Sequence, residues 1–543
     1  MSRTFLPAWQ HLEQLAAAAR PRHLRELWSA GDRAAAFSRA AGPLFMDFSK
    51  QRLDARELDA LLELARACGL EAATAALLRG EAVNNTEARP ALHSALRADA
   101  GDTVTVGGRN IIPEVQDSLA RMESVVERVH SRQWRGWSGR AITDVVNIGV
   151  GGSDLGAFMA CTALGEFAAP AAPALRLHFV SSIDGTQIAD LLRALRPETT
   201  LFIVSSKSFS TVDTLSNART ALQWMRSELD DVDMLLRHHF IGVSANAGRM
   251  SEWGLPEANQ ILLWEWVGGR FSLWSAVGLP LALKIGMQGF RDLLAGARFM
   301  DLHFRDTPLA DNLPVLLGLI GVWNATFLDI RAHAVLPYDG RLKFFPTYLS
   351  QLEMESNGKS VSRQGDALDY ATCPVLWGEV GPNAQHAFYQ LLHQGTQAVS
   401  SDFIAPVRRY GSARHDSLQL QHQLALANCL AQSRVLMLGD DCVAGGSAAP
   451  EFRRYRGNQP STTLLLDKLT PYSLGALLAL YEHKVFVMSV IWDINPFDQW
   501  GVELGKQIAD ETLQALASGG GEAFDGSTEA LMRHIRAGGR SAS

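Results

Sequence analysis

The stretch "DVVNIGVGGSDLGAFMACTAL", Asp144 to Leu164, decides the fold. It begins with a short apolar run, turns at a cluster of glycines, and continues with residues that favour a helix. The same order recurs in "LRLHFVSSIDGTQIADLLRAL", from Leu175, and in "TLFIVSSKSFSTVDTLSNARTAL", from Thr200. "RHHFIGVSANAGRM", from Arg237, predicts a fourth strand. Strand–turn–helix units in series predict a parallel sheet with helices on both faces.

The flanking regions extend this pattern in both directions. Residues before about 110 are rich in Ala, Leu, Arg and Glu, with apolar residues at helical spacing. Residues 285–330 are also predicted to be mostly helical. Three further strand candidates follow, in "ATCPVLWGEVGPNAQHAFYQLLHQG", "VSSDFIAPV" and "SRVLMLGDD". We therefore expect an α/β protein with two doubly wound three-layer αβα domains, a helical N-terminal layer and a C-terminal helical arm. The expected divisions are 1–110, 111–284, 285–500 and 501–543.

Composition narrows the class of protein. The 543 residues are 47% hydrophobic and 20% charged with a net charge of −7, and no basic block suggests a nucleic-acid partner. Five cysteines are scattered without C-x-x-C spacing, which is typical of a reducing compartment. There is no signal-peptide pattern, and the apolar run from Leu313 to Trp323 is too short to span a bilayer. We expect a soluble, cytoplasmic protein without a membrane partner.

A hydroxyl-rich loop follows the third strand unit. In "SSKSFSTVDT" five hydroxyl side chains surround Lys207, directly after a strand and before a helix; they are Ser205, Ser206, Ser208, Ser210 and Thr211. Hydroxyls, backbone N–H groups and an ammonium at a helix N-terminus suit one phosphate group. A capping turn rich in Ser and Thr is the alternative. The loop lacks the G-x-x-x-x-G-K-[ST] pattern, so a nucleoside triphosphate is not implied.

Two glycine-rich segments are less decisive by themselves. In "NIGVGGSDLG" the third glycine of a G-x-G-x-x-G fingerprint is replaced by Asp154, so a nicotinamide site is a weak interpretation and a tight turn is favoured. In "EWVGGRFSLW" Arg270 follows two glycines, which admit a close approach of the backbone. Arg270 is either an ordinary ion-pair residue or a fixed cation that points into a cleft.

Six segments in order make the pattern specific. "GVGGSDLG", "SSKSFST", "GGRFSLWSAVGLP", "QLEMESNGKS", "GEVGPNAQHAFYQLLHQGT" and "NPFDQWGVELGK" run from about 148 to 506. Together they closely resemble the glucose-6-phosphate isomerase (phosphoglucose isomerase) family. The resemblance implies two sugar-isomerase domains, at 111–284 and 285–500, a homodimer with the active site near the subunit interface, and no cofactor or metal. It also implies reversible conversion of glucose 6-phosphate to fructose 6-phosphate through ring opening and a cis-enediol.

The resemblance also implies roles for individual residues. The catalytic residues would be the base Glu355, the cation Arg270 that stabilises the enediol, and the ring-opening pair His386 and Lys506. The substrate-binding residues would be Gly152, Ser153, Ser206, Lys207, Ser208, Thr211, Gln351 and Gln499. Two small departures are Ser208, where many members have Thr, and Asp213, where Glu is frequent and could reach further towards Lys207.

Spacing separates the two glutamates of "LSQLEMESNGKS". "FFPTYLSQLEMESN" predicts a helix that begins near Pro346 and ends at Asn357-Gly358. Residues two apart on a helix diverge by about 200°, so Glu353 and Glu355 face opposite ways, and Glu353 is expected in an ion pair or in solvent. Gln351 and Glu355, four apart, share a face.

The two histidines of the next motif are also distinguished by position. His386 follows Asn383, a predicted helix N-cap, by three residues and is expected in the first helical turn, where the dipole disfavours an imidazolium. His393 is expected to be a packed or surface histidine.

Three other functions stay open at this point. The isomerase could also accept mannose 6-phosphate. The chain could be a sugar-phosphate-binding regulator on the same fold, although such a protein would be expected to lose Glu355, His386 or Lys506. A nicotinamide-dependent dehydrogenase is disfavoured by the broken glycine fingerprint.

Overall fold

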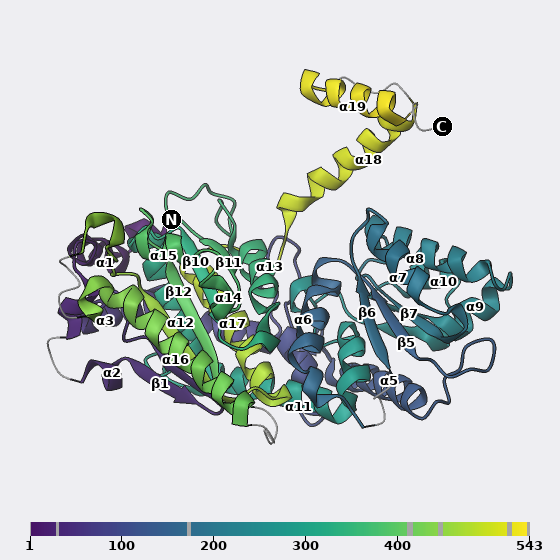
Figure 1. The fold of residues 1–543 in the computed structure, drawn as a ribbon, viewed down its shortest axis with the longest axis horizontal. Helices are drawn as coiled ribbons and strands as arrows, with labels where there is room; N and C mark the ends of the chain where they lie inside the picture. Colours follow the sequence, from purple (N-terminus) through teal and green to yellow (C-terminus); the bar gives the residue numbers. More distant parts are fainter. Residues whose placement is uncertain are drawn as a thin grey trace. The chain divides into compact units, whose positions relative to one another are not determined.

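The computed structural model describes residues 2–28, 32–170, 175–409, 416–443, 449–518 and 524–539 (Figure 1). The chain forms two compact units, Met1–Pro496 and Phe497–Ser543. The second unit contains a 3₁₀ turn, Trp500–Val502, and two helices, α18 (Glu503–Ser518) and α19 (Gly526–Gly539). Each unit is described below by itself.

Among the described residues, the strands of the first unit form two large sheets and a short hairpin. The five-stranded sheet is parallel, in the order β6 (Arg176–Val180), β5 (Asp144–Ile148), β7 (Thr200–Ser205), β8 (Phe240–Ser244) and β9 (Gln260–Leu262). The six-stranded sheet has the order β1 (Ser38–Ala41), β2 (Leu44–Asp47), β13 (Ser461–Lys468), β12 (Ser400–Arg408), β10 (Ala332–Pro337) and β11 (Val375–Gly378). The hairpin pairs β3 (Thr105–Val106) with β4 (Arg109–Asn110).

Helices surround both sheets. The N-terminal part contains α1 (Pro7–Ala19), α2 (Arg33–Ala36), α3 (Ala55–Ala67), α4 (Leu70–Arg79) and α5 (Ile112–His130). Around the five-stranded sheet are α6 (Leu155–Ala163), α7 (Thr186–Ala194), α8 (Val212–Arg226), α9 (Val232–His239) and α10 (Ala247–Glu252). The later helices are α11 (Leu279–Asp306), α12 (Leu313–Val322), α13 (Phe345–Asn357), α14 (Gly381–Ala384), α15 (Tyr389–Gln394), α16 (Asp416–Leu438) and α17 (Pro471–Ile491).

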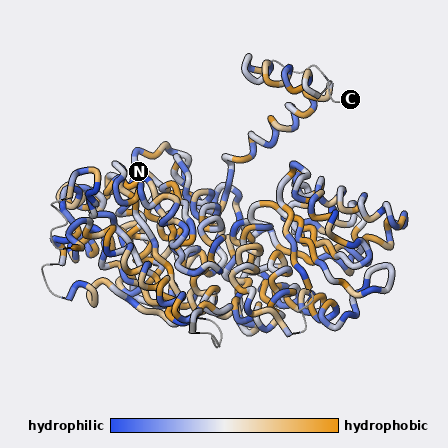
Figure 2. Tube along the Cα trace, in the orientation of Figure 1, coloured by the Kyte–Doolittle hydropathy of each residue, from blue (hydrophilic) through white to orange (hydrophobic). Residues whose placement is uncertain are grey.

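Both sheets are covered on both faces, as the doubly wound prediction requires. Val145 and Val146 of β5 point to opposite faces and are both fully buried. In the six-stranded sheet Phe403 of β12 packs with Leu436 of α16, whereas its neighbour Asp402 accepts a hydrogen bond from Tyr481 of α17. The prediction of three-layer αβα domains is confirmed, and Figure 2 shows the strands of the five-stranded sheet as mainly hydrophobic.

Helix α17 is the central helix of the first unit. It is long and apolar enough to cross a membrane, but its residues from Ser473 to Ile491 are buried, and it packs against α11, α12 and α13. The four consecutive polar residues Tyr481 to Lys484 are all buried within it. Burial of these side chains requires partners inside the protein, and these partners come from several different elements.

Two features differ from the sequence-based expectations. The run "SRVLMLGDD" was expected as a strand but ends the helix α16, since an apolar run alone does not distinguish a strand from a buried helix. The N-terminal part is largely helical as expected, but it also contributes the hairpin β1–β2. Gly42, at φ 51°, makes its tight turn, and β2 pairs antiparallel with β13.

Candidate active site

The candidate site lies at the point where the order in which strands are added to the five-stranded sheet reverses. Strand β5 lies between β6 and β7; the chain runs from β5 to β6 on one side and then crosses over to β7 on the other side. The loops after β5 and β7 therefore leave the same edge of the sheet side by side, which is where open parallel sheets bind ligands. These loops carry Gly152 and Ser153, and Ser206 to Thr211.

The loop after β7 groups hydroxyl side chains at the N-terminus of a helix. Ser206 Oγ lies 3.0 Å from Thr211 Oγ1, and Ser210 Oγ donates to Ser208 Oγ at 2.7 Å. Thr211 is the N-cap residue of α8, but its side chain makes no capping hydrogen bond. The first turn of this 15-residue helix thus leaves its N–H groups to another acceptor, in a place where the dipole favours negative charge.

Lys207 is held by a residue that sequence reasoning did not single out. Its Nζ donates to the backbone oxygen of Glu265 at 2.8 Å and lies 3.4 Å from the Glu265 carboxylate. Burial, with the nearby charge of Arg89, lowers the pKa of Lys207. Glu265 follows the β9 strand and opens the segment "EWVGGRFSLW", but only the fold brings it to Lys207.

The loop after β5 lies against the segment that carries Arg270. A Cβ atom added to Gly152 would lie 2.1 Å from the carbonyl carbon of Gly269. Ser272 Oγ donates to the backbone oxygen of Gly152 at 3.3 Å. Only glycine permits this approach at position 152.

Arg270 and Glu355 meet in the same place. Arg270 Nη1 lies 3.4 Å from Glu355 Oε2, while its Nε donates to Ser356 Oγ at 2.6 Å and its Nη2 donates to the backbone oxygen of Pro496. The Arg270 side chain is 1% exposed and that of Glu355 is 25% exposed. The guanidinium is therefore fixed from behind, and the carboxylate remains open to a substrate.

The helix that carries Glu355 is α13, with the ends that the sequence predicts. Lys359 Nζ donates to the backbone oxygens of Glu355 and Ser356 at 3.3 and 3.0 Å, which satisfies carbonyl groups of the last turn. Gln351, one turn earlier, lies beside the glycine loop, since a Cβ added to Gly151 would be 3.0 Å from Gln351 Nε2. Gly152, Arg270, Gln351 and Glu355 thus come together from three segments of the chain.

Comparison with known proteins agrees with this geometry. The family model described as phosphoglucose isomerase matches residues 47–532. The chain belongs to the phosphoglucose isomerase family. It is 58% identical to glucose-6-phosphate isomerase 2 of Chromohalobacter salexigens over 97% of this chain and 96% of the relative. It is equally identical, at 58%, to the glucose-6-phosphate isomerase of Psychrobacter arcticus, again over 97% and 96% of the two chains. The crystal structure of a glucose-6-phosphate isomerase from Chlamydia trachomatis matches with a TM-score of 0.85 and 30% identity, over 99% of this chain and 100% of that chain.

Glu353, the other glutamate of the family motif on α13, has a different environment. Its carboxylate accepts a hydrogen bond from Lys484 of α17 at 2.7 Å, and both side chains are almost completely buried. Burial lowers the pKa of Lys484, but Glu353 and Asp402 outweigh this and raise it. The expected ion pair is confirmed, and Glu353 faces away from Glu355.

Asp154 is an acid that sequence reasoning treated only as a departure from a glycine pattern. It follows Ser153 directly and is 5% exposed, and its Oδ1 has no hydrogen-bond partner among the residues that the structure describes. Burial raises the pKa of Asp154 to about 7, against a smaller opposing effect of Asn147. A buried acid with a raised pKa therefore lies directly after Ser153 in the loop that follows β5.

His386 is exposed on the turn between α14 and α15. The prediction that Asn383 caps its helix is wrong, because Val380 precedes α14 and Phe388 precedes α15. The helix begins earlier, with Pro382 in its first turn, and then breaks. The backbone N–H of His386 donates to the oxygen of Asn383, so the dipole argument for this histidine does not apply.

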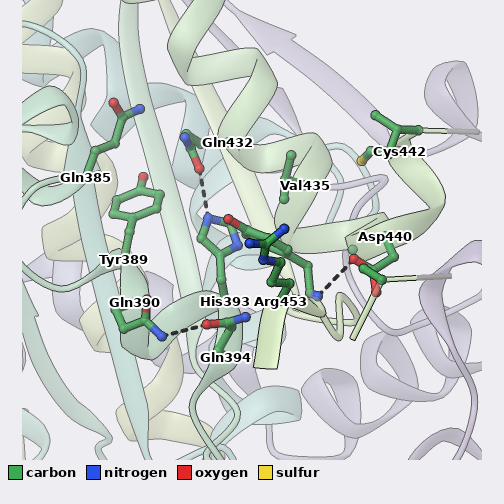
Figure 3. Close-up of a pocket in the computed structure, with 14 residues that line it drawn as sticks. Gln385, Tyr389, Gln390, His393, Gln394, Gln432, Val435, Asp440, Cys442 and Arg453 are labelled. Atoms are coloured by element: carbon green, nitrogen blue, oxygen red, sulfur yellow. Dashed lines mark hydrogen bonds between the residues drawn. The ribbon is translucent and has the colours of Figure 1, made fainter. Parts of the chain in front are cut away.

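His393 is packed, as expected, beside a separate cavity of about 660 Å³ (Figure 3). Its Nε2 lies 2.9 Å from Gln432 Oε1, and its ring contacts the rings of Tyr389 and Tyr455. None of the residues predicted for the site lines this cavity.

Gln499 and Lys506 lie in the second unit. Gln499 precedes the 3₁₀ turn, and Lys506 is an exposed residue of α18 that pairs with Glu503 at 3.0 Å. Their part in the site stays a prediction.

Proposed function

We propose that the protein catalyses the reversible isomerisation of D-glucose 6-phosphate to D-fructose 6-phosphate, through ring opening and a cis-enediol. Family membership supports the reaction. The placement of Glu355 beside Arg270 supports a mechanism through a cis-enediol. An exposed carboxylate beside a buried guanidinium suits proton transfer next to developing negative charge.

The phosphate binds at the start of α8. Ser206, Ser208 and Thr211 donate hydroxyl hydrogen bonds, and Lys207 supplies a positive charge. Gly152, Ser153, Gln351 and Gln499 contact the sugar. Anchoring the phosphate holds C1 and C2 at Glu355, which lowers the entropic part of the barrier.

Glu355 transfers the proton. It removes the C2 proton of the open aldose and returns it to C1. One carboxylate can perform both steps because C1 and C2 of the planar enediol present the same face to it. Arg270 stabilises the enediol oxygen, and it remains charged throughout because its guanidinium is a very weak acid. His386 and Lys506 move the protons that open and close the sugar ring.

His386 also supports a homodimer with the active site near the subunit interface. It is exposed on a turn of the first unit, whereas an acid–base group works best where water is excluded. The five cysteines are free thiols, which suits the cytoplasm. Division of the first unit near residues 110 and 284 remains part of the same proposal.

A coupled assay on fructose 6-phosphate with EDTA-treated protein tests the function. We expect turnover without added metal or nucleotide. Folded protein that binds a sugar phosphate without turnover would support the regulator instead. Mannose 6-phosphate in the same assay decides whether the enzyme is also a mannose 6-phosphate isomerase.

A further inference from the structure

Helix α13 has two working faces. Gln351 and Glu355, four residues apart, face the candidate active site. Glu353 and Asn357, also four apart, face α17. The face that meets the substrate and the face that meets the protein core are thus opposite sides of one helix.

The core face is attached to α17 by polar contacts. Lys484 Nζ donates to Glu353 Oε2 at 2.7 Å, and Asn357 Nδ2 donates to the backbone oxygen of Val485 at 3.1 Å. The side chains of Glu353 and Lys484 are 1% and 2% exposed. Apolar residues of similar size would give comparable or greater stability at such a position, so stability alone does not account for the pair.

Helix α17 is itself fixed to other elements. Tyr481 donates to Asp402 of β12 at 2.8 Å, Glu482 accepts from Arg97 at 2.6 Å, and His483 lies 2.7 Å from Asp301 of α11. These contacts hold α17 in place, and the hydrogen bond between Lys484 and Glu353 attaches α13 to it in a fixed orientation.

Small rotations of α13 matter for the proposed chemistry. A carboxylate about 6 Å from the helix axis moves by about 1 Å when the helix turns by about 10°. A displacement of about 1 Å at the reacting group costs about 100-fold in rate. Non-directional apolar packing resists such a rotation less than a hydrogen-bonded ion pair does.

We propose that the Lys484–Glu353 ion pair is a positioning element for the isomerisation, which sets the rotation of α13 and hence the place of Glu355. This inference rests on the proposed role of Glu355. The two residues do not touch the substrate and act only through α13.

The test is a mutant cycle of Glu353→Gln, Lys484→Met and the double variant. For each we would measure kcat, KM, inhibition by a phosphorylated sugar acid, and the melting temperature. We expect kcat to fall about 10- to 100-fold, with KM and the inhibition constant changed less than about threefold. The double variant removes the unpaired buried charge, so its melting temperature recovers while kcat remains low.

Asp144→Asn is the matched control. Asp144 is a buried carboxylate paired with Arg176 and His178, but it begins β5, at the opposite edge of the sheet from the site loops. The Asp144→Asn substitution should lower the melting temperature and leave kcat within about twofold of the wild-type value. If Glu353→Gln does not fold, Glu353→Asp keeps the charge, shortens the reach by about 1.5 Å, and should also lower kcat.

Two results would overturn the inference: unchanged kcat in the folded variants, or recovery of kcat together with stability in the double variant. Glu355→Gln, measured in parallel, separates this failure from failure of the proposed function. An inactive Glu355→Gln beside fully active Lys484 and Glu353 variants refutes only the positioning role. An active Glu355→Gln refutes the proposed base.

Discussion

Glu355 and Glu353 show how position on one helix separates two identical side chains. We expect Glu355→Gln to lower kcat by about 10²- to 10⁴-fold, because the amide is not a base. Inhibition by a phosphorylated sugar acid should persist, since Lys207 and the hydroxyl loop are intact. Glu228→Gln, at an exposed position, is the control and should retain full activity.

Lys207 is the second residue with a specific expectation. Lys207→Ala should weaken inhibition by phosphorylated sugar acids about 10- to 100-fold, as expected for loss of a charge-assisted hydrogen bond. Burial and Arg89 lower the pKa of Lys207, so its ammonium loses its proton at a lower pH than that of an ordinary lysine. The affinity of the wild-type protein for the phosphorylated inhibitor should therefore begin to decline at that lower pH. Unchanged inhibition in the alanine variant would contradict the phosphate role.

The raised pKa of Asp154 predicts how the free energy of unfolding depends on pH. Its pKa is about 7 in the folded protein and near 4 when unfolded, so the unfolded chain loses this proton first and stability falls as pH rises from about 4 to 7. Asp154→Asn removes this dependence and should raise the free energy of unfolding at pH 8 by about 2–4 kcal/mol. Urea denaturation at pH 5 and pH 8 checks it: equal effects at both pH values would argue against a raised pKa.

At the scale of elements, the contact between α11 and α17 depends on Asp301. Burial raises the pKa of this residue, but Arg97 and His483 outweigh it and hold the pKa at about 2. The stabilisation is therefore complete above about pH 4 and is lost as pH falls towards 2.

Asp301→Asn should lower the free energy of unfolding at pH 7 by about 3–5 kcal/mol, since it leaves Arg97 buried with one carboxylate fewer. The difference from wild type should narrow below pH 4. Asp306→Asn, exposed at the end of the same helix, is the control and should change stability by less than about 0.5 kcal/mol.

At the scale of the whole molecule, the proposed dimer can be tested by complementation. If His386 acts across the subunit interface, Glu355→Gln and His386→Ala are each inactive, but their co-expression restores activity. Half of the dimers are then mixed and one of two sites in each is intact, so about a quarter of wild-type activity should return. A monomer in sedimentation, or no recovery in a verified mixed dimer, would contradict a site shared between subunits.

Parts of this molecule follow directly from local patterns. The units from Asp144 and Thr200 predict β5, α6, β7 and α8, because a buried parallel strand is a short apolar run and glycine or hydroxyl residues mark its turn. Helix α13 and the opposite directions of Glu353 and Glu355 follow from helical periodicity alone. The hairpin β1–β2 was missed because its strands are short and because β2 joins the sheet through β13, more than 400 residues later.

The sequence by itself determined the alternating architecture, the family, and which residue types carry charge at the ends of strands. These properties depend on neighbours within about twenty residues or on ordered motifs. The tertiary structure decided that Glu265 holds Lys207, that Lys484 neutralises Glu353, and that Asp154 is buried. Such contacts depend on how distant segments pack together, and burial sets both the charge state and the partner of each group only once that packing exists.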